Sequence, residues 1–178
     1  MNIKRFRLIC NLLSYILKFF LAITAVMTVF IIVSIFADPG NTITPFIDLS
    51  SRTFVQSGRG YYSDADLALT AKIIIPIVTA TYAYIFWKAS SLFNYLADGH
   101  TPFSPFFSRS VKVISILMIV HDFIVPLLHS LVLSLIMKNG YSFSFGLSDY
   151  FFYGLTFYVA AEVLNYGIEL QQLSDETV

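Results

Sequence analysis

The sequence has few of the residues on which most enzymes and small secreted domains depend. It contains one cysteine, Cys10, so an intramolecular disulfide, a CxxC redox centre and a thiolate zinc site are excluded. Only 12% of the 178 residues are charged, about half the usual share. The 11 basic and 11 acidic side chains cancel, so nothing indicates nucleic-acid binding. Walker, dinucleotide-binding, HExxH and nucleophile-elbow motifs are absent, which argues against an enzyme or a cofactor protein.

Apolar residues are correspondingly abundant. They make up 57% of the chain, aromatic residues make up 17%, and the mean hydropathy is +0.74. This exceeds what a soluble core needs, so we predict an all-α integral membrane protein, a single domain over 1–178 that forms a four-transmembrane-helix bundle. The helices are expected at about 12–36, 63–97, 104–137 and 149–171. The first is too long for the apolar part of a secretory signal and is interpreted as a retained helix.

Local signals predict the helix boundaries. Ser63 and Asp66 resemble a capping box, which starts the second helix. Gly99 and the prolines after it end that helix, and Ser104 with Pro105 starts the third. The intervening segments are a hairpin at 98–104, an outer loop at 38–62 whose prolines and glycines break regular elements, and a short aromatic and serine loop at 141–148.

The basic residues predict the orientation. Seven of the eleven flank either the N-terminus or the hairpin: Lys4, Arg5, Arg7, Lys18, Lys88, Arg109 and Lys112. By the positive-inside rule, the N-terminus, the hairpin and the C-terminus are cytoplasmic, and the other two loops lie outside the cell.

Five polar residues form a candidate intramembrane polar cluster: His121, Asp122, His129, Glu162 and Asn165. Asp122 lies ten residues beyond Lys112, about 15 Å along the helix and near the bilayer midplane. His129 is some 12 Å from His121 along the axis, too far to share one metal ion, so no metal site is expected. Asp122 could relay protons with His121 or Glu162, but a buried cluster that fixes helix packing is the favoured interpretation.

Glu162, Asn165 and Glu169 share one stripe of the last helix. A polar stripe in a membrane helix normally faces protein, so an ion pair that ties this helix to its neighbours is favoured over a binding or catalytic role. The candidate basic partners near the same interface are Lys88, Arg109 and Lys112.

Two cytoplasmic segments carry a resemblance to a known family. Phe93, Leu96, Gly99, Pro102 and Phe103 follow the spacing FxxLxxGxxPF, and the chain ends in GIELQQLSDETV. These motifs resemble the YoaS-like bacterial membrane family (domain of unknown function 2975). The chain departs from the family pattern where His100 and Thr101 separate the glycine from Pro-Phe, and at Leu173 and Ser174 in the tail.

The resemblance implies a four-helix protein of the bacterial cytoplasmic membrane and carries no activity with it. It places emphasis on a candidate cytoplasmic contact face, made of Gly99, Pro102, Phe103, Gly167, Glu169, Gln171 and Asp175. The first hypothesis is therefore a regulatory or interaction module that uses this face. The alternative is a small ion- or proton-coupled transporter that uses Asp122 and Glu162. The expected partners are the lipid bilayer, a membrane or cytoplasmic protein and a second copy of the chain.

Overall fold

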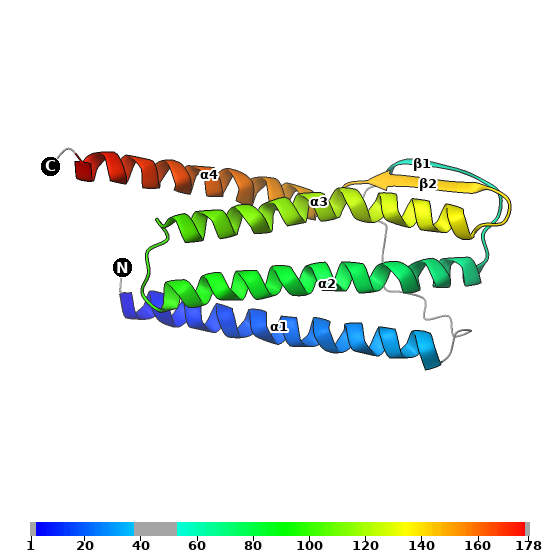
Figure 1. Ribbon diagram of the computed structural model, residues 1–178, viewed down its shortest axis with the longest axis horizontal. Helices are drawn as coiled ribbons and strands as arrows, with labels where there is room; N and C mark the ends of the chain where they lie inside the picture. The colour runs from blue at the N-terminus through cyan, green and yellow to red at the C-terminus, as the bar shows by residue number, and fades with distance from the viewer. Residues whose placement is uncertain (1–2, 38–52, 177–178) are drawn as a thin grey trace.

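The computed structural model describes residues 3–37 and 53–176 of the chain, and four long helices account for most of them. Figure 1 shows the helices lying lengthwise beside one another, with both termini at the same end. The elements, in chain order, are α1 (Ile3–Ala37), β1 (Thr53–Arg59), α2 (Asp64–Ala97), α3 (Pro105–Ile136), β2 (Tyr141–Gly146) and α4 (Asp149–Glu176).

The predicted caps start both central helices. The Ser63 hydroxyl accepts from the backbone N–H of Asp66, whose carboxylate accepts from the N–H of Ser63, so α2 begins with a complete capping box. Ser104 accepts from the N–H of Phe107 and is followed by a proline, so α3 begins at Pro105. Gly99, at φ +94°, supplies the left-handed residue that ends α2.

The helices pack as a row in chain order. Helix α1 packs on α2, α2 on α3 and α3 on α4, and within the described residues the backbones of non-consecutive helices do not meet. Among those same residues, three helices are long and apolar enough to cross a membrane, namely α1, α2 and α3. The fourth expected span, 149–171, is helical but is not one of these three, so its place in the membrane stays a prediction.

The packing places apolar side chains outside and small polar ones inside. Leu8 and Val26 of α1 are each 67% exposed, whereas Ser14 is 1% exposed and Thr70 and Ser115 are fully buried. The apolar core between α2 and α3 is small and centres on Leu92, Ile114 and Met118. Such an arrangement suits a hydrocarbon solvent, in which helices associate through close packing and hydrogen bonds and not through a hydrophobic drive.

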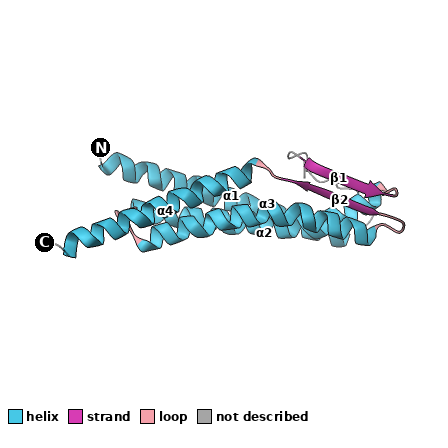
Figure 2. Cartoon of the chain, turned by 90° about the horizontal axis from the view of Figure 1, so that it is seen from above, coloured by secondary structure: helices cyan, strands magenta, loops and turns pink. Residues whose placement is uncertain are grey.

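A short sheet corrects the expectation of irregular loops. Strands β1 and β2 pair antiparallel from Thr53 opposite Gly146 to Arg59 opposite Tyr141, at the end of the molecule away from both termini (Figure 2). The loop prediction for 141–148 missed that YSFSFG alternates with the period of a strand. Gly58, taken as a breaker, lies inside β1 where the chain passes the carbonyl of Tyr141 closely. Residues 38–52 of the expected outer loop lie outside the described part.

The outer helices are longer than predicted. Helix α1 begins at Ile3, nine residues before the expected start at 12, and α4 ends at Glu176, five residues after the expected end at 171. The predicted bounds followed the apolar runs, whereas a helix can continue through the basic and acidic segments at either end because those segments contain no proline or glycine that breaks it.

Candidate functional site

Asp122 anchors the start of α4. Its side chain is 7% exposed, and its carboxylate accepts hydrogen bonds from the Ser148 backbone N–H at 2.7 Å and from the Ser148 hydroxyl. The same hydroxyl oxygen accepts from the backbone N–H of Tyr150 at 3.2 Å. Ser148 directly precedes α4, so the carboxylate lies at the positive end of that helix dipole. The hydrogen bonds from Ser148 and the helix dipole therefore offset the free-energy cost of burying the Asp122 carboxylate, which has a structural role.

This anchor makes α4 start about halfway along α3. Asp122 lies near the middle of the 32 residues of α3. Figure 1 shows that α4 begins beside the middle of α3 and runs beyond the α2–α3 hairpin. The contacts follow this register, because Gly154 lies against Ser115 and Ser108 donates to the carbonyl of Ala161 at 3.0 Å.

The other half of α3 is covered by β2 through a ladder of serine hydroxyls. Ser134 accepts from the N–H of Ser142 at 3.0 Å, and its one hydroxyl proton is shared between the Ser142 carbonyl at 2.8 Å and the Ser130 carbonyl of its own helix at 2.7 Å. Ser130 accepts from the N–H of Ser144 at 2.9 Å, and its proton is shared between the Ser144 carbonyl at 3.0 Å and the Pro126 carbonyl at 2.8 Å. Residues four apart on a helix are separated by about 6 Å, close to the roughly 6.6 Å between alternate strand residues. The helix thus supplies the hydrogen bonds that a third strand would supply.

The two histidines of α3 do not join Asp122 in one site. His121 packs against the ring of Tyr82, with centroids 4.9 Å apart, and its Nε2 is buried without a hydrogen-bond partner in the described part of the molecule. His129 lies about two helical turns farther along α3. No group of three or more His, Cys, Asp or Glu residues that could hold a metal ion occurs within 3–37 and 53–176.

Glu162 pairs with Lys112, one of its three candidate partners. The Lys112 Nζ lies 2.5 Å from Glu162 Oε1, and the two side chains are 41% and 42% exposed. Lys112 and Asp122 are ten residues apart on α3, so Glu162 lies about 15 Å along the helix from Asp122. The residues of the expected intramembrane cluster therefore do not form one site: Asp122 contacts Ser148, and Glu162 contacts Lys112. They are separated because the Asp122 anchor determines which part of α3 each residue of α4 lies against.

Two members of the expected cytoplasmic contact face touch each other. The ring of Phe103 packs on Gly167, where an added Cβ would lie 3.2 Å from Phe103 Cε1. The Arg7 guanidinium instead fills the space beside Gly99, so the hairpin is covered there by α1. Glu169 and Gln171 are exposed, Pro102 is half-buried, and the side chain of Asp175 lies outside the described part.

Sequence reasoning missed the polar contact that holds α1. The Ser14 hydroxyl donates to Asn94 Oδ1 at 2.6 Å and lies 2.9 Å from the Ser90 hydroxyl. Cys10, one turn earlier, is also buried at this face. The signal was present as small or polar residues four apart, Cys10 with Ser14 on one helix and Ser90 with Asn94 on the other, which is the spacing that lets membrane helices approach closely.

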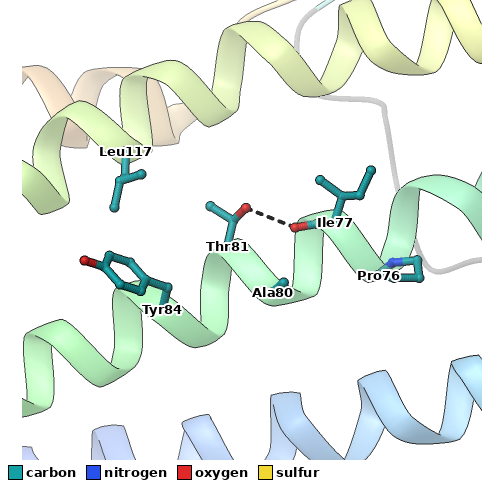
Figure 3. Close-up of a pocket in the computed structure, with 6 residues that line it drawn as sticks. All are labelled: Pro76, Ile77, Ala80, Thr81, Tyr84 and Leu117. Carbon is teal, nitrogen blue, oxygen red and sulfur yellow. Dashed lines mark hydrogen bonds between the residues drawn. The ribbon is translucent and has the colours of Figure 1, made fainter.

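An apolar pocket of about 560 Å³ lies between α2 and α3. Figure 3 shows the hydroxyl of Thr81 turned back to the carbonyl of Ile77, a hydrogen bond of 3.0 Å within α2. The hydroxyl is therefore satisfied and the pocket offers hydrocarbon surface. Its lining consists of Pro76, Ile77, Ala80, Thr81, Tyr84 and Leu117.

No protein-family model, curated protein or solved structure matches this chain. The resemblance to the YoaS-like family therefore stays a hypothesis carried by two motifs.

Proposed function

We propose that the protein is a multi-pass protein of a bacterial cytoplasmic membrane, and that its cytoplasmic end docks a protein partner. Three lysines support the position of the cytoplasmic interface. Lys18 and Lys88 lie at the same position along the paired helices α1 and α2. On the side toward the termini, Ser14 hydrogen-bonds to Ser90. On the opposite side, Phe20 stacks on Phe86, with ring centroids 5.9 Å apart. Lys112 lies near the same level, because Ile114, two residues on, packs with Leu92, one turn of α2 from Lys88. We call Lys18, Lys88 and Lys112 the lysine band.

Each lysine of the band lies over an aromatic ring, as is typical of an interface where a long side chain has an apolar stem and a charged end. The distances from Nζ to ring centroid are 5.3, 5.8 and 5.2 Å for Lys18 over Tyr15, Lys88 over Phe106 and Lys112 over Tyr158. From Lys18 to the end of α1 at Ala37 the helix extends about 28 Å without a charge, which matches a hydrocarbon core of roughly 30 Å.

The end of α4 carries the docking proposal. Six consecutive residues, 169–174, are exposed. A helix packed along one side buries at least one residue in each turn, so this run indicates that α4 has left the other helices. Glu169, Asp175 and Glu176 are acidic, and no basic residue lies in the last turn. An anionic membrane surface repels such a segment, whereas a partner with a basic surface attracts it.

Site-specific cross-linking tests this proposal. A photoreactive residue at Gln171 in native membranes should give a protein adduct, and adding Glu169→Lys should reduce its yield. Leu131, 57% exposed on the apolar part of α3, is the matched control and should give lipid adducts. The docking proposal is wrong if Gln171 yields only the adducts seen at Leu131.

The transporter hypothesis has one observation in its favour: the Nε2 of His121, next to Asp122 in the chain, is buried and has no hydrogen-bond partner within residues 3–37 and 53–176. A relay would also need Asp122 to exchange protons with a neighbour. Both of its oxygens instead accept from Ser148, and Glu162 is paired with Lys112. An ion- or proton-coupled transporter is therefore the second hypothesis, and Asp122→Asn, which cannot carry a proton, tests it separately from the first.

A further inference from the structure

A second pocket, of about 550 Å³, lies where α3 and α4 meet beside the lysine band. Its volume is within the roughly 300–1,000 Å³ that is usual for small-molecule sites. Helix α3 contributes five lining residues and α4 contributes two: Pro105, Phe106, Ser108, Arg109, Lys112, Glu162 and Asn165.

Of the two basic side chains that line this pocket, one is able to bind an anionic ligand. Lys112 is neutralised by Glu162 at 2.5 Å, and the Ser108 hydroxyl donates to the carbonyl of Ala161. Arg109 and Asn165 are exposed, and neither makes a hydrogen bond or ion pair with another described residue. Arg109 thus gives the pocket a net charge of one positive unit, with an amide beside it.

A guanidinium and an amide are suited to a phosphodiester. The planar guanidinium can donate two parallel hydrogen bonds to phosphate oxygens, and the amide NH₂ can donate a third. The net charge of the pocket matches the single negative charge of such a group. Lys88, whose Nζ lies 5.8 Å from the centroid of the lining residue Phe106, adds positive potential nearby.

The surface next to the pocket is suited to acyl chains. An exposed apolar stripe runs along α4 from near the Asp122 anchor to the turn that carries Glu162, and consists of Phe152, Leu155, Val159 and Val163, which are 48%, 48%, 57% and 65% exposed. These residues follow the spacing of one helical face. A phosphate in the pocket would have hydrocarbon surface leading from it toward the centre of the bilayer.

We propose that this pocket binds the headgroup of an anionic phospholipid of the phosphatidylglycerol class, with Arg109 and Asn165 on the phosphate and the acyl chains along the α4 stripe. The inference rests on the proposed membrane placement. It is independent of the docking surface, because cross-linking at Gln171 reports on docking separately and should not change in an Arg109 variant.

Native mass spectrometry of the full chain in detergent, titrated with phosphatidylglycerol or phosphatidylethanolamine, tests the site. We expect phosphatidylglycerol to bind more tightly, Arg109→Gln to weaken it about tenfold and Asn165→Ala about threefold. Arg5→Gln removes the same charge from an exposed position on α1 and should change neither. Arg109→Lys should retain part of the affinity, because a lysine keeps the charge without the fork.

Three outcomes would overturn the proposal. The first is equal binding of the two lipids, which would mean that the pocket does not select a net negative headgroup. The second is unchanged binding in Arg109→Gln. The third is full displacement of the lipid by excess inorganic phosphate, which would make this a site for free phosphate and not for a lipid.

Discussion

The carboxylate of Asp122, in the middle of α3, accepts hydrogen bonds from both the backbone N–H and the hydroxyl of Ser148, the residue before α4. This contact determines where α4 begins and therefore which residues of α3 and α4 meet. Lys112 with Glu162, Ser108 with Ala161 and Phe103 with Gly167 all lie on the hairpin side of the anchor.

Asp122→Ala should destabilise the protein by about 2–3 kcal/mol, because it leaves the N–H of the half-buried Ser148 without its acceptor and removes a charge-assisted hydrogen bond. Thermal unfolding in detergent measures the loss. Asp98→Ala is the matched control, since Asp98 is an exposed carboxylate. Equal stability of the two variants would contradict the anchoring role.

The substitution Asp122→Asn distinguishes an anchoring role of Asp122 from a role in proton transport. The Asn oxygen can accept from the Ser148 N–H and its NH₂ can donate to the Ser148 hydroxyl oxygen, so the anchor should hold with a loss of about 1 kcal/mol or less. The variant cannot carry a proton. A pH-dependent flux in liposomes that disappears in this folded variant would establish the transporter hypothesis, whereas a flux of full strength would exclude a proton relay through Asp122.

Replacing Ser130 and Ser134 together by alanine should release β2 from α3. Each hydroxyl accepts from one strand N–H, so amide exchange at Ser142 and Ser144 should accelerate about tenfold or more when the acceptor is removed. Hydrogen exchange read by mass spectrometry checks this. Ser91→Ala changes a half-buried serine of α2 away from the ladder and should leave the exchange unaltered.

The labelling rate of Cys10, the single cysteine, measures how firmly α1 is held against α2. Cys10 is 2% exposed, so a small maleimide should label it slowly in the native protein. Ser14→Ala or Asn94→Ala removes the 2.6 Å hydrogen bond between Ser14 of α1 and Asn94 of α2 and should raise the labelling rate several-fold. Ser91→Ala again serves as the control. An unchanged rate in both variants would contradict a role of this hydrogen bond in holding α1.

The two glycines of α4 should tolerate a methyl group unequally. A Cβ at Gly154 would lie 2.8 Å from Ile119 Cγ1 and 3.0 Å from the Ser115 carbonyl oxygen, whereas at Gly167 it would meet only the Phe103 ring, at 3.2 Å. Gly154→Ala must shift α4 away from backbone and should cost about 1–3 kcal/mol. Gly167→Ala should cost less because a ring can move. Unfolding in detergent compares them, and the reverse order would contradict the close approach at Gly154.

Several features were predictable because they depend on neighbours in the chain. A few consecutive residues predict the caps at Ser63 and Ser104 and the Gly99 turn. The three most apolar helices follow from long apolar runs in the chain. Three basic residues near the cytoplasmic interface were the candidate ion-pair partners of Glu162, because the last helix was expected to end at that interface. In the structure the partner is Lys112.

The sheet and the site geometry were beyond local reasoning. Strands β1 and β2 are separated by both central helices in the sequence, and neither strand has a partner until those helices bring them together. Asp122 and Glu162 were grouped as members of one candidate intramembrane polar cluster. The half-length overlap of α3 with α4 separates them, because the Asp122 anchor at the start of α4 places Glu162 against Lys112.

By itself, the amino-acid sequence determined that long apolar helices dominate this protein, where the two central helices begin and which polar residues lie far from either helix end. These properties depend on composition and on hydrogen bonds within a turn or two. Only the tertiary structure decided what the polar residues do. Asp122 became the anchor of α4, the serines of α3 became the edge for β2, and Arg109 was left in a pocket without an ion-pair partner among the residues that the structure describes. Each outcome depends on the register between segments distant in the chain, and packing across the whole molecule sets that register.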